Sequence, residues 1–267
     1  MTEISETEQT QDAEAEIPML AAKDIVYKYS QSTVLYSVSM EVYAGELVAL
    51  VGRNGAGKST LLRCLAGWTR PQSGYVTIDG RLLESDERAA REKVILLPDT
   101  PRFYDELTAW EHIQFYARLH NLQDWKDRAE TYLNDFALWN FRQEYPFTYS
   151  RGMRYKLAIT LALLVAPPVL LLDEPFSPLD AISSVYLWDV LAEYSGDETA
   201  ILLSSHALPE EALPDNYVVM ESGQIMAEGS AEMLGQQYGI DEDFSLDELL
   251  ESVLGVEYDD DSDDESE

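Results

Sequence analysis

The sequence predicts an α/β fold in which helices cover both faces of a largely parallel sheet. Short strand-like runs alternate with helical segments across residues 24–226, which is typical of this class. The run Val169–Leu172 is continuously apolar, as in a strand buried on both faces. A mostly helical stretch at about 100–168 predicts a lobe inserted into the sheet domain. With 46% hydrophobic residues in 267, the chain has enough apolar material for a substantial core.

The first hundred residues contain the expected strands, separated by one helix. Strand-like runs lie at 24–29, 34–42 and 46–51, and shorter ones at 77–78 and 94–97. The third run leads directly into a glycine-rich loop and then into an apolar helix at 59–66. That order of strand, glycine-rich loop and helix is typical of a phosphate-binding unit.

The expected lobe contains three helices. Thr108 and Glu111 match a capping box at the start of the first helix, which runs through Leu119. A second helix spans 124–136, and Ser150 caps a third over about 152–165. After the lobe, a helix at 183–194 and a strand at 199–204 complete a β–α–β unit. A hairpin pairs 218–220 with 224–226.

Both ends of the chain are acidic. The net charge is −32, and residues 1–16 and 241–267 contain six and fourteen acidic residues with no Lys or Arg. We expect disordered tails at 1–18 and 256–267, and an amphipathic helix at 241–255 that packs on the domain. This charge argues against nucleic acid as a partner. We expect no signal peptide and no membrane span, because the longest apolar run is too short and contains Pro167–Pro168.

Residues 52–59, GRNGAGKS, match the P-loop pattern. Gly52, Gly55 and Gly57 allow positive φ and close approach of a ligand, and the loop N–H groups can bind phosphates at a helix N-terminus. Lys58 supplies charge for the β- and γ-phosphates, and Ser59 can ligate Mg²⁺. The predicted ATP site consists of Gly52, Arg53, Asn54, Gly55, Ala56, Gly57, Lys58, Ser59 and Thr60. The strand before the loop and the helix after it argue against an accidental match.

Two carboxylates follow the buried strand at 169–172. In an α/β sheet, the carboxyl ends of the strands line the ligand site, so Asp173 can hold Mg²⁺ through water. Glu174 can polarise an attacking water. The alternative is that two acids simply end a strand, and a P-loop in the same chain disfavours it.

Further motifs resemble those of the ABC ATPases, over about residues 20–235. YSRGMR, from Tyr149, resembles the ABC signature, and SPLD, ending at Asp180, resembles the D-loop. LLSSH places His206 as the switch histidine, KYS places Tyr29 against adenine, and LLPDTP places Asp99 at the Q-loop. The resemblance implies an ABC ATPase domain at 19–240, with a RecA-like core, an antiparallel β subdomain and an inserted helical subdomain.

The resemblance also implies a mechanism and partners. Two such domains would enclose two ATP molecules head to tail, as a homodimer or a paralogous heterodimer. Ser150 and the N–H of Gly152 would contact the γ-phosphate of the other subunit's ATP, and Asp180 would link the two sites. Glu174 would be the general base, and His206 would hydrogen-bond the γ-phosphate. The partner would be a transmembrane permease subunit, which would hold the chain peripherally at the cytoplasmic face of the membrane.

Some positions depart from the commonest family pattern. Asp99 stands where Gln is usual, and Arg151 and Met153 stand in the signature where Gly and Gln are common. The form YSxGM resembles the branch of ABC-2-type and heme exporters, which favours export. The departures leave open a weakly active, ATP-binding regulatory half of a heterodimer, although Glu174 and His206 are intact. An ABC ATPase of translation or DNA maintenance is disfavoured, because the chain has one such domain and no long coiled-coil insertion.

Three other side chains are expected to have no role in the site. We expect His112 and His120 to be solvated helix residues, since neither belongs to a motif. The single cysteine, Cys64, is expected to be a small buried residue within a helix.

Overall fold

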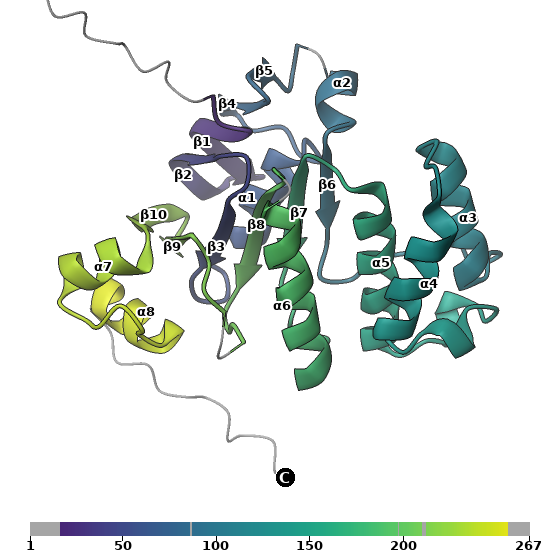
Figure 1. The fold of residues 1–267 in the computed structure, drawn as a ribbon. Helices are drawn as coiled ribbons and strands as arrows, with labels where there is room; N and C mark the ends of the chain where they lie inside the picture. Colours follow the sequence, from purple (N-terminus) through teal and green to yellow (C-terminus); the bar gives the residue numbers. More distant parts are fainter. Residues whose placement is uncertain (1–16, 86, 197, 210–211, 256–267) are drawn as a thin grey trace, which may run out of the picture.

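A six-stranded sheet forms the centre of the molecule (Figure 1). The computed structural model describes residues 17–255, apart from 86, 197, 210 and 211. The strand order is β10-β9-β3-β8-β7-β6; β10 is antiparallel to β9, and the other neighbours are parallel. The predicted parallel sheet is therefore confirmed. Its strands are β3 (Leu47–Val51), β6 (Val94–Leu97), β7 (Val169–Asp173), β8 (Ala200–Ser205), β9 (Asn216–Glu221) and β10 (Gln224–Gly229).

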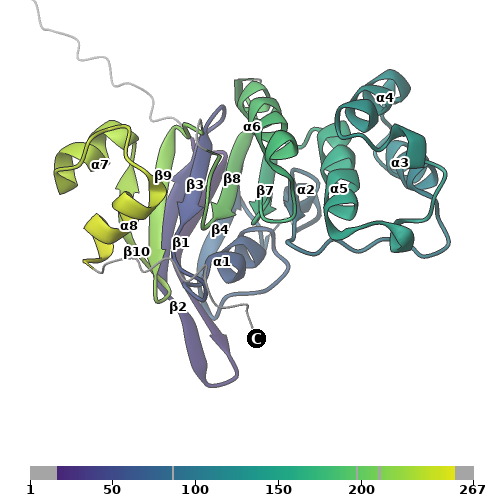
Figure 2. The same cartoon turned by 90° about the horizontal axis from the view of Figure 1, so that it is seen from below.

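Helices cover both faces of this sheet. In the view of Figure 2, α1 (Lys58–Leu65) and α6 (Ala181–Gly196) lie on opposite sides of it. Leu170 and Leu172 pack in the same cluster as α6, whereas Val169 and Leu171 pack in the same cluster as α1. Because alternate side chains of β7 point to opposite faces and both are covered, its sequence is apolar throughout.

Strand register brings the carboxyl ends of four strands to one edge. Val51 of β3 pairs with Ser205 of β8, and Asp173 of β7 pairs with Ser204. Leu97 of β6 pairs with Leu172 on the other side of β7. The loops that follow β3, β7, β8 and β6 therefore leave the sheet together, which is where ligands bind in open α/β sheets.

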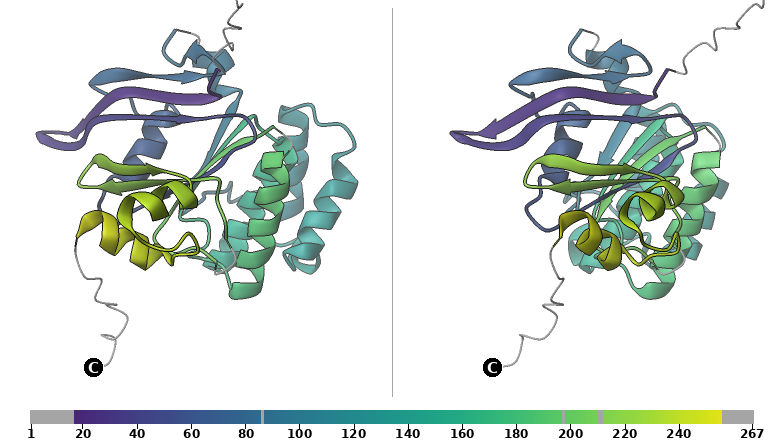
Figure 3. Two further views of the ribbon diagram at one scale, coloured as in Figure 1. Left: turned by 60° about the vertical axis from the view of Figure 1, so that its left-hand side comes forward. Right: turned by 90° about the vertical axis from the view of Figure 1, so that its left-hand side faces the viewer.

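A second, antiparallel sheet lies over α1 (Figure 3). Its order is β2-β1-β4-β5, and the strands are β1 (Leu20–Tyr29), β2 (Ser32–Val42), β4 (Ser73–Ile78) and β5 (Arg81–Leu82). The strand predicted at 24–29 begins four residues earlier, because residues 20–22 are buried and pair with both β2 and β4. Such pairing depends on the distant strand β4, which local alternation cannot reveal.

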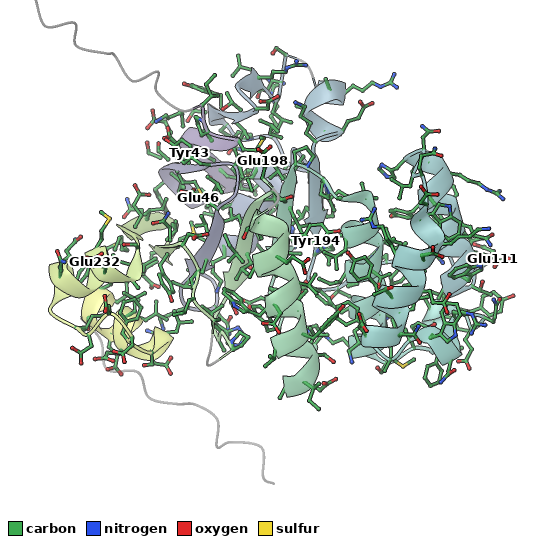
Figure 4. All side chains as sticks on the ribbon, in the orientation of Figure 1. Tyr43, Glu46, Glu111, Tyr194, Glu198 and Glu232 are labelled. Atoms are coloured by element: carbon green, nitrogen blue, oxygen red, sulfur yellow. The ribbon has the colours of Figure 1, made fainter. Side chains whose placement is uncertain are left out.

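The segment between β6 and β7 is helical and lies at one end of the sheet, opposite the C-terminal helices (Figure 2). Polar contacts tie it to α6, which carries Tyr194 (labelled in Figure 4). The Tyr194 hydroxyl donates to the Leu163 carbonyl, and Arg128 donates to the Tyr194 hydroxyl. Its helices are α3 (Ala109–Leu119), α4 (Trp125–Asp135) and α5 (Arg151–Val165), with 3-10 turns at Trp139–Phe141 and Pro146–Thr148.

The predicted helix starts are confirmed at two of three positions. The Thr108 hydroxyl accepts from the N–H of Glu111, and the Glu111 carboxylate accepts from the N–H of Thr108, completing the capping box. The Ser150 hydroxyl accepts from the N–H of Met153. Asp124 is the residue before α4 rather than part of it, because its φ of 48° is left-handed.

The C-terminal region contains one helix more than predicted. The hairpin of β9 and β10 is confirmed. The helix α7 (Ala231–Tyr238) was not predicted, because Gly235 interrupts its apolar pattern and lowers its helix propensity. A Cβ at Gly235 would lie 2.9 Å from the Ile240 carbonyl oxygen, so a close turn requires glycine there. The predicted helix at 241–255 is shorter in the structure, where α8 spans Leu246–Leu254 because the Ser245 hydroxyl caps it by accepting from the N–H of Glu248. This helix buries Leu249 and Leu250 completely, so the apolar stripe packs on the domain.

His112 corrects a prediction, since its side chain is buried rather than solvated. Its Nε2 accepts from the Tyr104 N–H at 3.0 Å, and its Nδ1–H donates to the Thr108 carbonyl at 2.9 Å. Burial lowers the pKa of His112, and the neutral ring satisfies both nitrogens. His120 is exposed, and Cys64 is buried, as expected.

The helix α2 (Glu87–Arg91) and the strand β5 were also not predicted. Within residues 17–255, as far as they are described, no helix combines the length and hydrophobicity needed to cross a bilayer. The predicted tails, 1–18 and 256–267, lie outside the described residues except for residues 17 and 18. The predicted domain boundaries, 19–240 and about 100–168, stay predictions.

Candidate active site

The loop between β3 and α1 adopts the conformation that its glycines permit. Gly52, Gly55 and Gly57 have φ values of 151°, 84° and 108°, which L side chains rarely adopt. A Cβ at Gly52 would lie 2.0 Å from the Met220 carbonyl oxygen, so the β9 backbone excludes any side chain there. At Gly55, an added Cβ would meet no described atom within 4 Å. The loop is therefore packed against β9 at Gly52 and open to its surroundings at Gly55.

Lys58 closes the loop at the start of α1. Its side chain is buried, and its ammonium donates to the Gly52 carbonyl oxygen at 2.6 Å and the Arg53 carbonyl oxygen at 3.5 Å. The same ammonium lies 3.3 Å from a carboxylate oxygen of Glu174. Lys58 thus joins the loop after β3 to the loop after β7, which the sequence predicted only as two separate motifs.

Asp173 ends β7 and is 2% exposed. Its Oδ1 accepts from the hydroxyl of Ser59 at 2.9 Å and from the hydroxyl of Ser204 at 2.8 Å. Burial raises the pKa of Asp173, and these two hydrogen bonds oppose the rise. Ser59 and Asp173, predicted as Mg²⁺ ligands, are therefore in direct contact.

This donor set fits magnesium bound together with a phosphate. One hydroxyl and one carboxylate are few ligands, as is usual for Mg²⁺, which keeps waters and takes phosphate oxygens. The described residues contain no group of three or more His, Cys, Asp or Glu arranged to hold a metal. A divalent cation would also stabilise the buried carboxylate of Asp173 in its charged form.

Glu174 sits in a strained backbone position between two cationic or titratable side chains. Its φ is 49°, which is uncommon for a residue with a Cβ and costs about 1 kcal/mol or more. Its N–H donates to the hydroxyl and the carbonyl oxygen of Ser204, both at 3.1 Å. One carboxylate oxygen faces Lys58, and the other contacts His206 Nδ1 at 2.8 Å. The His206 N–H also donates to it, at 3.3 Å.

The signature segment and the D-loop contact each other within this chain. Gly152 is in the first turn of α5, and a Cβ there would lie 2.7 Å from the Pro178 carbonyl oxygen. Lys156, one turn further along, donates to Asp180 at 2.9 Å. Asp180 precedes α6 and caps it by accepting from the N–H and the hydroxyl of Ser183. The hydrogen bond from Lys156 is the largest cause that holds the pKa of Asp180 below its ordinary range.

The remaining predicted residues lie at the margins of this network. Tyr29 ends β1, is half-exposed, and packs edge-on against Tyr27 with ring centroids 4.8 Å apart. Asp99 follows β6, is half-buried, and accepts from the Thr100 hydroxyl at 3.3 Å. Thr60 is buried within α1. Among the described residues, no hydrogen bond or ion pair joins Ser150, Gly152 or Asp180 to the P-loop of the same chain.

Three residues that the sequence did not single out support the site. Ser204, on β8, donates to the Asp173 carboxylate and accepts from the Glu174 N–H, and Lys156 pairs with Asp180. Gly223, in the turn of the β9–β10 hairpin, donates its N–H to the Ala56 carbonyl at 2.8 Å and so braces the P-loop. Ser204 lies within the motif LLSSH, so its position beside the carboxylates offered a signal. The other two contacts depend on tertiary structure.

Comparisons with known proteins agree with this geometry. A family model described as ABC transporter matches residues 35–177. The chain is 31% identical over 234 residues to the ABC-type transporter ATP-binding protein EcsA of Bacillus subtilis (strain 168), covering 86% of this chain and 94% of that protein. It is 37% identical over 208 residues to the human phospholipid-transporting ATPase ABCA3, covering 76% of this chain but 12% of ABCA3. The solved structure of an ATP-binding subunit of an ABC transporter aligns with a TM-score of 0.82 at 33% identity, covering 88% of this chain and 99% of that one.

Proposed function

Since the chain belongs to the ABC transporter ATP-binding family, we propose that it hydrolyses Mg·ATP to drive export through a separate transmembrane partner. The observation that carries the proposal is the contact of Lys58 with Glu174 and of Ser59 with Asp173. These contacts join a phosphate-binding loop to two carboxylates at the edge of the sheet where ligands bind. Such an arrangement suits phosphoryl transfer to water, in which catalysis consists mostly of positioning and charge stabilisation.

Each core residue has a distinct role in this proposal. The P-loop N–H groups and Lys58 bind the phosphates, and Ser59 and Asp173 hold Mg²⁺, which neutralises charge that develops on the phosphate oxygens. Glu174 accepts the proton of the attacking water. His206, held to Glu174 at 2.8 Å, hydrogen-bonds the γ-phosphate and keeps Glu174 oriented.

The pairing of Lys58 with Glu174 supports a competition on nucleotide binding. Glu174 occupies Lys58 at 3.3 Å in the structure. A γ-phosphate carries more negative charge than a carboxylate, so it takes over the Lys58 ammonium and releases Glu174 toward water. The base is thereby available chiefly when ATP is present.

The lobe side of the site completes the nucleotide site of a second subunit. Ser150 and Asp180 are exposed and make no described contact with the P-loop of their own chain. The N-terminus of α5, with Ser150, exposed Arg151 and Gly152, suits an anion brought by another copy. Tyr29 stacks on the adenine of its own site. The partner copy is a second identical chain or a paralogue.

A cleft between the lobe and the central sheet suits the transmembrane partner. It has a volume of about 550 Å³, and Trp68 beside it is 56% exposed, which is unusual for so large an apolar side chain. Arg63 and Arg102 also line it. In a chain of net charge −32, two arginines in one cleft favour an acidic segment of the membrane protein, which would hold the chain peripherally at the cytoplasmic face.

The alternative, a weakly active regulatory half of a heterodimer, is less well supported. Asp99 and Arg151 depart from the common family pattern, which favours it. However, the groups that perform hydrolysis are present and mutually hydrogen-bonded, from Lys58 through Glu174 to His206.

Steady-state hydrolysis of Mg·ATP by the purified chain tests the proposal, beside a Glu174→Gln variant. We expect kcat to fall by about a hundredfold or more in the variant, because removal of a general base typically has such an effect. Glu174→Gln should also accumulate as an ATP-bound dimer in size-exclusion chromatography. Glu130→Gln, an exposed substitution on α4, is the matched control and should hydrolyse ATP like the wild type. A wild type that binds ATP but neither hydrolyses it nor dimerises would favour the regulatory alternative.

A further inference from the structure

Tyr155 is a buried tyrosine whose hydroxyl lacks a partner. It lies in α5, one turn after Gly152, and its side chain is completely buried. No described residue accepts a hydrogen bond from its hydroxyl or donates one to it. Buried tyrosines usually find a partner, because a buried donor without one costs about 1–3 kcal/mol. The position therefore calls for an acceptor.

The surroundings of this hydroxyl point to the nucleotide site. Its electrostatic neighbours are the carboxylates of Asp173, Asp99 and Glu174, in decreasing order of influence. The pKa of Tyr155 is held well above its ordinary value, first by burial and then by these charges. The hydroxyl therefore keeps its proton and can donate a hydrogen bond to a carboxylate.

The face of α5 that carries Tyr155 also faces the loop of Asp99. Ala158 and Ala162, three and seven residues after Tyr155, lie on the same side of the helix. Both line the 550 Å³ cleft together with Asp99. Asp99 is half-buried, and within the described part of the chain its carboxylate accepts only the 3.3 Å contact from Thr100. A weakly held carboxylate thus lies in the cleft, and the helix that lines the cleft carries the unpartnered donor on the same side as Ala158 and Ala162.

We propose that Tyr155 is a positioning residue for ATP hydrolysis, and that its hydroxyl donates a hydrogen bond to the Asp99 carboxylate when Mg·ATP is bound. This inference rests on the proposed function. Bound nucleotide removes water from Asp99, and a carboxylate that loses water needs a hydrogen-bond donor. Tyr155 is a neutral donor already on the adjoining helix. The new bond ties α5, with Ser150 and Gly152 at its start, to the occupied site.

The substitution Tyr155→Phe separates this role from a structural one, because stability and nucleotide binding should change in opposite directions. Without nucleotide, the full chain should melt about 2–4 °C higher, since an unsatisfied buried hydroxyl has been removed. The Kd for the slowly hydrolysed analogue Mg·AMP-PNP, measured by calorimetry, should rise about tenfold, because a hydrogen bond formed on binding is lost. If the hydroxyl only supported folding, its removal in Tyr155→Phe would lower the melting temperature instead.

Tyr194→Phe is the matched control, since the Tyr194 hydroxyl is already hydrogen-bonded to the lobe. It should melt at a lower temperature and bind the analogue like the wild type. In an Asp99→Ala background, Tyr155→Phe should no longer change the Kd.

An unchanged Kd in Tyr155→Phe, or an equal change with and without Asp99, overturns the inference. A wild type that fails to bind the analogue overturns the proposed function instead.

Discussion

The two halves of the proposed nucleotide site differ in how their polar groups are partnered. On the central sheet, Lys58 and Asp173 are 5% and 2% exposed and hydrogen-bonded to other site residues. On the lobe side, Ser150 and Asp180 are exposed, and their contacts serve the ends of α5 and α6. The first half is a closed network within one chain, and the second presents groups outward.

This difference agrees with the roles that the proposed function gives to the two halves. Groups that act on the reacting atoms need fixed positions before the reaction, and burial among hydrogen bonds supplies them. In the proposed function, groups that meet another subunit's ligand must be accessible, so contacts between α5 and the D-loop hold them instead of burial. The contact of Gly152 with the Pro178 carbonyl and the ion pair of Lys156 with Asp180 give the lobe half a frame of its own.

The largest expected effect belongs to the sheet half. In Gly52→Ala, the new Cβ would lie 2.0 Å from the Met220 carbonyl oxygen at a φ of 151°. We expect the free energy of unfolding to fall by about 3 kcal/mol or more, and binding of Mg·AMP-PNP to be lost, because the loop and β9 cannot both keep their places. Denaturant unfolding and calorimetry measure the two quantities.

Gly55→Ala is the control within the same loop. Its φ of 84° is also positive, but a new Cβ would meet no described atom within 4 Å. Only conformational strain remains, which costs about 1 kcal/mol. If the two variants were equally stable, the close support of the P-loop by β9 would be wrong.

A smaller effect is expected at the lobe half. Gly152→Ala places a Cβ 2.7 Å from the Pro178 carbonyl oxygen, although alanine is the better helix former. We expect a net loss of about 1 kcal/mol in unfolding free energy and slower ATP hydrolysis, because the D-loop is pushed away from α5.

Gly196→Ala, at the end of α6, makes the matched comparison, since no described atom lies within 4 Å of its Cβ. It should stabilise the chain by about 0.5–1 kcal/mol. If Gly152→Ala stabilised the chain to the same degree, the D-loop would not be packed against α5 in solution.

The same contrast separates what the sequence could predict from what it could not. The P-loop and the pair Asp173–Glu174 were predicted because their chemistry lies in consecutive residues after buried strands. The cap at Thr108 is equally local, since a capping box spans four residues. The roles assigned to these residues remain predictions, and the contacts of Ser59 with Asp173 and of Lys58 with Glu174 come from the structure, because the motifs were predicted separately.

Features set by distant residues were beyond reach of the sequence. His112 is buried, and the Tyr104 N–H and the Thr108 carbonyl satisfy its ring, which no motif signals. The Lys156–Asp180 pair joins residues 24 positions apart, and the helix of Tyr155 lines a cleft together with the loop of Asp99, which precedes that helix by more than fifty residues. The helix α7 was missed because Gly235 serves a tight turn rather than the helix itself.

The smallest expected effect concerns the ion pair that frames the lobe half. The Lys156 side chain is 12% exposed and the Asp180 side chain 61%, so solvent screens the pair. A double-mutant cycle of Lys156→Met and Asp180→Asn should give a coupling energy of about 0.5–1 kcal/mol. Added salt should reduce it, because screening is effective for partly exposed charges.

The pH dependence of this pair has a definite sign. The pKa of Asp180 is lower in the folded protein than in the unfolded chain, first because of Lys156 and then because of Ser183. Its contribution is therefore fully present above the unfolded value of about 4 and is lost as the pH falls below it. Wild type should exceed Asp180→Asn in unfolding free energy at pH 7, and the gap should narrow below about pH 4. A gap that stayed constant with pH would show that the charge of Asp180 does not hold the D-loop to α5.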